Sequence, residues 1–94
     1  MQIRWLEDAV VDLQKLHTYI QKENPKAANN VAKRIYEALD LLSSHPGMGR
    51  AGRVPYTREL IISGSSYIIP YRVKAERVEI LRVLHASMPW PEEL

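Results

Sequence analysis

The chain contains no cysteine and no long hydrophobic run among its 94 residues. The lack of cysteine excludes disulfide bonds, a thiol nucleophile and a thiolate metal site. The longest apolar runs are only a few residues, far short of the ~20 that cross a bilayer, and the residues after Met1 are polar and charged. We therefore expect neither a membrane span nor a signal peptide, and we expect the protein to reside in the cytoplasm.

The common catalytic and cofactor-binding motifs are missing as well. The chain has no GxGxxG, no Walker loop and no HExxH, and its three histidines fall in different predicted elements. The segment Gly47–Arg50 has the glycines of a phosphate-binding loop, but it lacks the strand before and the helix after that such loops need. We accordingly expect no metal and no cofactor.

The composition is that of one small globular domain covering residues 1–94. Hydrophobic residues make up 46% and charged residues 26% of the chain, and this length leaves no room for a second core. The net charge of +2 is unevenly distributed, because residues 1–48 are neutral while residues 49–82 carry seven basic and three acidic side chains. This basic segment predicts a polyanion or an acidic protein as the partner.

The first half of the chain predicts a short strand and two helices. Residues 2–6 favour a strand, and Glu7 opens an apolar stripe at helical spacing that comprises Ala9, Leu13, Leu16 and Ile20. Asn24-Pro25 is typical of a helix N-cap followed by proline at the first helical position, and the second helix is expected to run to about Leu42. The two helices should form an antiparallel hairpin.

The second half predicts a glycine-rich loop over residues 43–53 and three strands, over residues 58–63, 67–73 and 78–85. Pro70 removes a ladder donor, so we expect a bulge or an unpaired edge there. Residues 78–85 are apolar at both parities, which favours a central strand buried on both faces. The fold class is therefore α+β, ordered strand–helix–helix–strand–strand–strand, with a small antiparallel sheet and the helical hairpin packed on one face.

Five arginines gather on the predicted sheet and its leading loop. A guanidinium can hold a phosphate or a carboxylate with two parallel hydrogen bonds, so this set could grip an RNA backbone or an acidic peptide. Interleaved tyrosines could stack on bases. Any one of these side chains could equally be a solvated charge or a tyrosine at the edge of the core. The residues are Arg50, Arg53, Arg58, Arg72 and Arg82, with Tyr56, Tyr67 and Tyr71.

Arg82 and His85 lie in the most apolar predicted strand. A buried arginine is costly unless it is paired, so Arg82 should either reach an open concave face or meet Glu79 or Glu59. His85 could act as a general acid or base near neutral pH, although a histidine at a strand end is often only a hydrogen-bonded structural residue.

An ordered series of short motifs over nearly the whole chain resembles the RelE/ParE superfamily of bacterial toxin–antitoxin toxins. The motifs are Asp12-Leu13, Tyr19-Ile20, HPGMGR at 45–50, REL at 58–60, YIIPYRV at 67–73 and ILRVLH at 80–85. The resemblance implies a compact sheet carrying a helical hairpin. It also implies a cognate antitoxin whose C-terminal segment wraps the toxin, and the two proteins could assemble as a toxin–antitoxin heterotetramer.

The two branches of the superfamily imply different activities. RelE-like members cut mRNA on the ribosome without a metal, using basic residues and a tyrosine near the C-terminus, whereas ParE-like members poison DNA gyrase. This chain has no tyrosine after Tyr71, and it has Ile68 or Ile69 where RelE-like enzymes place a catalytic arginine. The resemblance is therefore closer to the ParE branch.

Three hypotheses follow. The preferred one is a toxin acting on a protein target, with DNA gyrase as the candidate, whose target- and antitoxin-binding residues are Arg50, Arg53, Arg58, Tyr67, Tyr71, Arg72, Arg82 and Trp90. The second is a metal-independent endoribonuclease in which His85 is the acid/base and Arg82 or Arg58 steadies the phosphate. The third is a non-toxic binding domain or a decayed toxin. Whether the protein is an enzyme is thus left open by its sequence.

Overall fold

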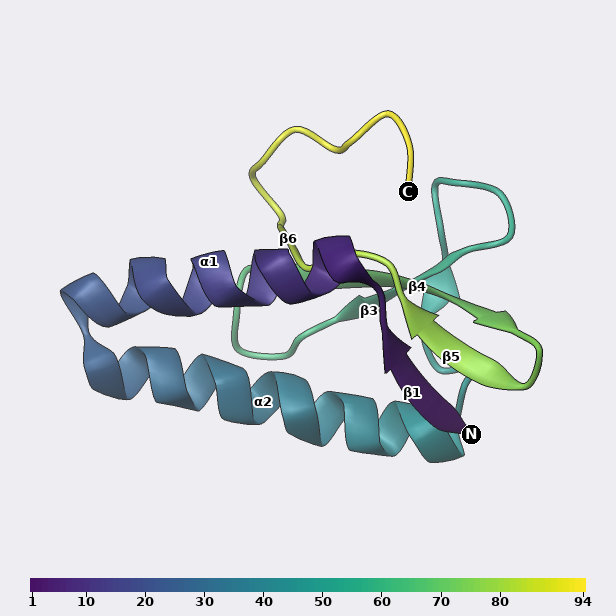
Figure 1. Ribbon diagram of the computed structural model, residues 1–94, viewed down its shortest axis with the longest axis horizontal. Coiled ribbons are helices and arrows are strands. Elements are labelled where there is room, and N and C mark those ends of the chain that lie inside the picture. Colours follow the sequence, from purple (N-terminus) through teal and green to yellow (C-terminus); the bar gives the residue numbers. More distant parts are fainter.

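The computed structural model describes all residues, 1–94, and contains two helices and six short strands (Figure 1). The strand–helix–helix–strand order predicted for the α+β fold is confirmed, and an extra two-residue strand interrupts the glycine-rich loop. The elements are β1 (Gln2–Trp5), α1 (Glu7–Glu23), α2 (Pro25–Ser44), β2 (Arg50–Ala51), β3 (Arg58–Ile61), β4 (Tyr67–Lys74), β5 (Arg77–Ile80) and β6 (Leu84–His85).

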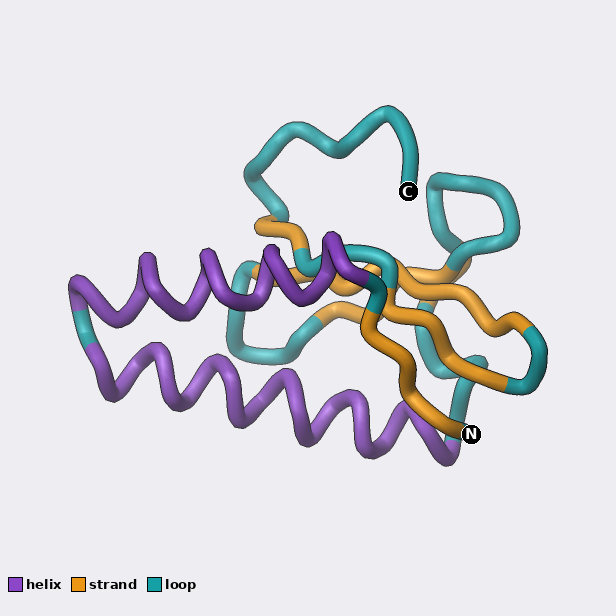
Figure 2. The backbone as a smooth tube through the Cα atoms, in the orientation of Figure 1, coloured by secondary structure: helices purple, strands orange, loops and turns teal.

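A single residue, Asn24, joins the two helices. Its backbone N–H donates to the carbonyl of Ile20 at 2.8 Å, which closes α1. Its side-chain oxygen accepts from the N–H of Ala27 at 3.1 Å and so caps α2, with Pro25 in the first turn. The helices therefore lie side by side in opposite directions, as predicted (Figures 1 and 2).

The sheet has the order β1-β5-β4-β3-β2, and β6 pairs with the first residues of β4. The strands from β2 to β6 pair antiparallel, but β1 pairs with β5 in parallel, with Ile3 opposite Val78. The sheet is thus mixed, and the expectation of an antiparallel sheet is corrected at this edge. Parallel neighbours need a long connection, and here the connection from β1 to β5 contains both helices and three strands.

The predicted strand over residues 78–85 is interrupted by a bulge opposite Pro70. Tyr71 pairs with Ile80 and Ile68 pairs with Leu84, so two residues of β4 face three residues of the other segment. The carbonyl of Pro70 accepts from the N–H of Leu81 at 3.0 Å, and its ring nitrogen faces the same interrupted ladder. The expected bulge is confirmed, and the continuous strand is corrected to β5, an irregular segment over residues 81–83 and β6.

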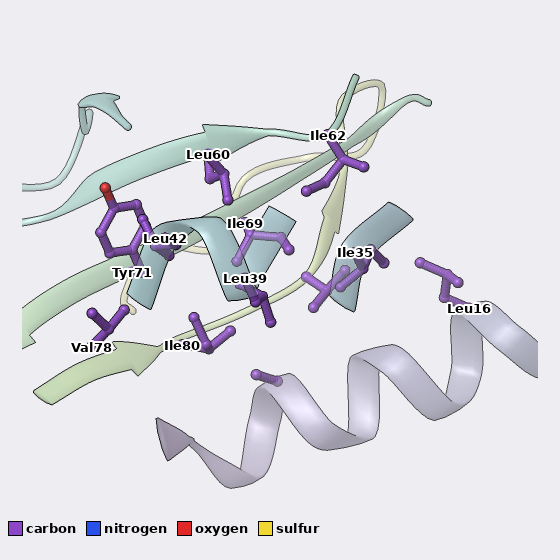
Figure 3. Packing of buried hydrophobic residues seen from close by; sticks show 12 residues of the cluster. Leu16, Ile35, Leu39, Leu42, Leu60, Ile62, Ile69, Tyr71, Val78 and Ile80 are labelled. Atoms are coloured by element: carbon purple, nitrogen blue, oxygen red, sulfur yellow. The ribbon is translucent and has the colours of Figure 1, made fainter. Parts of the chain in front are cut away.

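The hydrophobic core lies between one face of the sheet and the helical hairpin (Figure 3). Side chains alternate along a strand, so a single face carries the core residues of β3, β4 and β5. The sheet contributes Leu60, Ile69, Tyr71, Val78 and Ile80, and the helices contribute Ala9, Leu16, Ile35, Leu39 and Leu42. Neither helix combines the length and the apolar character that crossing a membrane requires.

Candidate functional site

The face of the sheet that points away from the helices, here called the open face, carries most of the predicted arginines. Alternation along the strands places Glu59 of β3, Arg72 of β4 and Glu79 of β5 on this face. Arg50 of β2 lies directly opposite Glu59, and Arg53 follows in the next loop. The residues after β6 form a tail that lies at the same side of the molecule as the loop between β2 and β3 (Figures 1 and 2).

Glu59 is a buried carboxylate that organises two of the arginines. Its side chain is 3% exposed, and its oxygens accept from Arg50 Nε and Nη2 at 3.2 and 2.9 Å and from Arg53 Nε at 3.2 Å. The backbone N–H of Arg53 donates a further bond at 2.9 Å. Burial raises the pKa of Glu59, but the bonds from Arg53 and Arg50 together outweigh it and hold the pKa below its ordinary value. The ionised carboxylate therefore fixes both guanidinium groups in place.

Arg53 also joins this site to the C-terminal tail, residues 86–94. Its guanidinium carbon lies 3.7 Å from the centre of the Trp90 ring, in a cation–π contact. The indole Nε1 of Trp90 is buried and has no hydrogen-bond partner. Arg53 is thus held between a carboxylate and an aromatic ring, which is how the structure brings the predicted residue Trp90 to the arginine cluster.

Arg72 pairs with the second buried carboxylate of the open face. Its Nε donates to Glu79 Oε1 at 2.6 Å, across the β4–β5 ladder. The hydrogen bond from Arg72 is the main reason why the pKa of Glu79 lies below its ordinary value. Arg72 keeps four N–H donors free for a partner, because only its Nε is used within the chain.

Arg82 lies on the other side of the sheet, and neither Glu59 nor Glu79 is its partner. It makes two hydrogen bonds to Asp12 of α1, from Nε at 2.7 Å and from Nη2 at 3.0 Å. The bulge turns this side chain toward the hairpin instead of the open face, which corrects the predicted partners. The bonds to Asp12 raise the pKa of Arg82, so its charge is permanent and internally neutralised.

Arg58 and Tyr71 hold the loop that precedes β2. Arg58 Nη1 donates to the carbonyls of Gly49 and Gly47 at 2.8 and 3.3 Å. The hydroxyl of Tyr71 donates to the carbonyl of Pro46 at 2.7 Å and accepts from the N–H of Gly49 at 2.9 Å. Tyr71 is fully buried, so it supports the loop. The prediction that its ring contacts a partner is therefore corrected.

His85 lies at the far end of β4 from Arg58. Its Nδ1 is 2.6 Å from the hydroxyl oxygen of Ser87, and its ring meets Tyr67 edge-on at 5.3 Å between centroids. The partners of His85 and Arg58 on β4, Tyr67 and Tyr71, are four residues apart, roughly 13 Å along the strand. With Arg82 held by Asp12, the structure does not bring the three proposed nuclease residues together.

Sequence reasoning did not assign roles to Asp12 and Arg4, although both are well placed. Asp12 belongs to a motif quoted above. The signal available in the sequence was an acidic side chain beside the apolar stripe of the first helix. Arg4 lies opposite Glu79 across β1 and β5, a neighbour that only the parallel pairing creates. No group of three or more histidine and carboxylate side chains is placed to hold a metal ion.

Residues 3–90 match the family model described as the ParE toxin of the type II toxin–antitoxin system parDE. The chain is 45% identical over 93 residues to the candidate toxin Y4kP of Sinorhizobium fredii, covering 99% of this chain and 96% of that one. It is 36% identical over 84 residues to toxin ParE1 of Caulobacter vibrioides, with 85% and 83% covered. Toxin RelE2 of the same bacterium is 35% identical over 86 residues, with 92% and 96% covered.

Two solved structures share the fold. The chromosomal ParDE toxin–antitoxin system of P. aeruginosa superposes with a TM-score of 0.83 at 27% identity, covering 93% of this chain and 97% of that chain. The RelBE2 toxin–antitoxin complex of Mycobacterium tuberculosis superposes with a TM-score of 0.62 at 29% identity, covering 89% and 95%.

Proposed function

Because this chain belongs to the ParE toxin family and is the toxin of a type II toxin–antitoxin system, we propose that it arrests growth by binding DNA gyrase and that a cognate antitoxin neutralises it. The observation that carries the proposal is the arginine cluster of the open face. Arg50 and Arg53 are about half exposed, at 50% and 49%, yet both are fixed by one buried carboxylate. Such a preorganised cationic surface loses little freedom when a partner binds.

The geometry favours a binding role over catalysis. Each residue of the nuclease hypothesis is engaged elsewhere: Arg82 with Asp12, Arg58 with the loop carbonyls and His85 with Ser87. The proposed acid/base, His85, contacts Ser87 and Tyr67 and makes no hydrogen bond to an arginine that could stabilise a phosphate in the transition state. The open face instead offers charge beside the aromatic ring of Trp90, as binding surfaces commonly do.

The antitoxin is proposed to cover the same cluster. An acidic segment could meet the free N–H groups of Arg50 and Arg53, and an apolar side chain could pack beside Trp90. A purified toxin–antitoxin complex should then associate more slowly as salt rises, with a much smaller change in its dissociation rate. Its mass in solution tests the predicted toxin–antitoxin heterotetramer.

The direct test of the target is whether purified toxin traps gyrase–DNA cleavage complexes. We expect linearised plasmid to accumulate with wild-type toxin and at least tenfold less with the triple variant Arg50→Gln, Arg53→Gln, Glu59→Gln. Replacing Glu59 as well avoids leaving an unpaired buried carboxylate. The matched control, Lys15→Gln with Lys22→Gln, removes two exposed charges from α1 and should act as wild type. No trapping at saturating toxin would refute the gyrase proposal.

The ribosome-dependent nuclease is kept as the second candidate because relatives named RelE2 and RelE1 are 35% and 33% identical to this chain. The specific structural feature in its favour is the polar cluster of His85, Ser87 and Tyr67. Cleavage of mRNA on programmed ribosomes would support this activity. An unchanged cleavage rate in His85→Ala would remove the role proposed for His85.

A further inference from the structure

A second group of cations, distinct from the Glu59 cluster, lies at the other end of the open face. This basic patch consists of Arg4, Arg72, Lys74 and Arg77, contributed by β1, β4 and β5. Arg4 and Arg72 flank Glu79 across neighbouring strands. Lys74 and Arg77 face each other directly at the end of the β4–β5 ladder. All four side chains therefore project from three adjacent strands on the same face.

The charges of the basic patch are mostly unneutralised. Among the salt bridges of the chain, only Arg72 of this group takes part, through Glu79. The lowered pKa of Glu79 keeps it ionised, so the four cations and this carboxylate carry a net charge of +3. Like charges directly opposite on a sheet destabilise it, and the pair Lys74–Arg77 is such a case. Neither Lys74 nor Arg77 forms a salt bridge that would offset this repulsion.

The turn that presents this pair is strained. Ala75 and Glu76 connect β4 to β5 and have φ angles of +51° and +60°. A two-residue hairpin with both angles positive normally uses asparagine, aspartate or glycine, and alanine in this region is unfavourable. The tight turn holds Lys74 and Arg77 in direct register at the tip of the hairpin. Strain of this kind is typical of segments that present a binding surface.

The basic patch lacks the features that a peptide partner needs. Two of its neighbours on the open face, Gln2 and Glu79, are polar, the apolar neighbour Pro70 is fully buried, and the exposed Val73 points to the opposite face. It therefore has no apolar or aromatic anchor of the kind that dominates protein–protein binding. It also has no ring on which an unpaired base could stack. A partner bound through charge alone, by release of counterions from phosphates, fits this chemistry.

We propose that the basic patch binds the phosphate backbone of duplex DNA without sequence preference. The choice of DNA as the source of the phosphates rests on the proposed function, because a gyrase poison works on a protein that holds DNA. The Glu59 cluster with Trp90 would then meet a protein while the basic patch meets the DNA beside it. Glu79 fixes the side chain of Arg72, and the hairpin turn fixes the backbone register that sets Lys74 opposite Arg77.

The test measures binding of the full-length toxin to a fluorescent 30-base-pair duplex by anisotropy, without gyrase. Four phosphate contacts predict a log–log salt slope of about −3.6 and roughly a 100-fold loss of affinity between 50 and 200 mM salt. The variant Arg4→Gln, Lys74→Gln, Arg77→Gln should flatten the slope by about 3 and weaken binding at least tenfold. The control Lys15→Gln, Lys22→Gln, Lys26→Gln removes the same charge from the exposed surface of the hairpin and should bind as wild type.

Three results would overturn the proposal. Equal losses in the two triple variants would mean that only net charge matters. Poly-glutamate bound as tightly as the duplex at the same salt would assign the basic patch to an acidic protein segment. Tighter binding to duplex RNA than to duplex DNA would assign it to RNA. Because gyrase is absent, DNA binding with these properties stands even if the gyrase proposal fails.

Discussion

The carboxylate of Asp12 on α1 is bonded to the guanidinium of Arg82, 70 residues later in the chain, through two hydrogen bonds of 2.7 and 3.0 Å. The same carboxylate accepts a third bond, from the N–H of Val83 at 3.0 Å. Asp12 thus neutralises the charge of Arg82 and accepts a hydrogen bond from a backbone N–H of the bulge between β5 and β6. It ties the helical hairpin to the point where the sheet ladder is interrupted.

Replacing Asp12 by alanine should destabilise the protein by about 2 kcal/mol, because a half-buried arginine and a backbone donor both lose their acceptor. Urea unfolding at pH 7, followed by circular dichroism, measures this change. The control is Glu37→Ala, which breaks the exposed pair with Lys33 and should cost less than ~0.5 kcal/mol. Equal effects of the two substitutions would contradict the structural role of Asp12.

The loop before β2 depends on close contact between Gly49 and Tyr71. A Cβ atom on Gly49 would lie 2.6 Å from the tyrosine hydroxyl and 2.7 Å from its ring. We expect Gly49→Ala to destabilise the protein by about 2 kcal/mol through overpacking. Gly47→Ala, whose added Cβ would meet nothing within 4 Å, should be near neutral, and thermal unfolding of both variants measures the difference. A stable Gly49→Ala protein would show that the loop does not need this packing.

Glu59 should make the free energy of unfolding depend on pH. Its pKa is lower in the folded protein than the ordinary value of about 4.3 in the unfolded chain. Its contribution is therefore complete above the unfolded pKa and is lost as the pH falls through the folded pKa. In urea unfolding between pH 7 and pH 3, Glu59→Gln should lose less stability than wild type on acidification, although it starts less stable at pH 7. Parallel pH profiles would refute this role.

The contact between Arg53 and Trp90 can be followed by fluorescence. In a Trp5→Phe background, Trp90 is the only indole, and we expect Arg53→Ala to shift its emission to the red and to raise acrylamide quenching about twofold, because the ring loses its cover. Arg50→Ala is the matched control, since it contacts Glu59 but not the indole. An emission shift of the same size in both variants would mean that loss of the bonds to Glu59, and not loss of the stacking contact, changes the fluorescence of Trp90.

The local elements were predictable from the sequence because their signals are short-range. The helical stripes, the cap at Asn24 and the two hairpin turns all depend on neighbours within a few residues. The bulge at Pro70 was equally predictable, since proline lacks a donor wherever it lies in a sheet. The arginine cluster around Arg50 and Arg53 was recognised as a set, without its geometry.

The pairings between distant elements could not be predicted from the sequence. No local sequence feature distinguishes parallel from antiparallel placement of β1, so the neighbours of Arg4 could not be predicted. The partner of Arg82 was predicted among nearby glutamates, whereas the bulge rotates it toward Asp12. A shift of one residue in register moves a side chain to the other face of a sheet, and sequence alone does not set that register here.

The sequence by itself therefore determined the fold class, the family motifs and the excess of positive charge between residues 49 and 82, because these follow from composition and local periodicity. Only the tertiary structure decided which charges remain available. Glu59, Glu79 and Asp12 neutralise or fix four of the five predicted arginines, and the contact between Asp12 and Arg82 joins segments 70 residues apart. Arg4, Lys74 and Arg77 form no salt bridge because strand register places them on one face where the single carboxylate, Glu79, is bonded to Arg72.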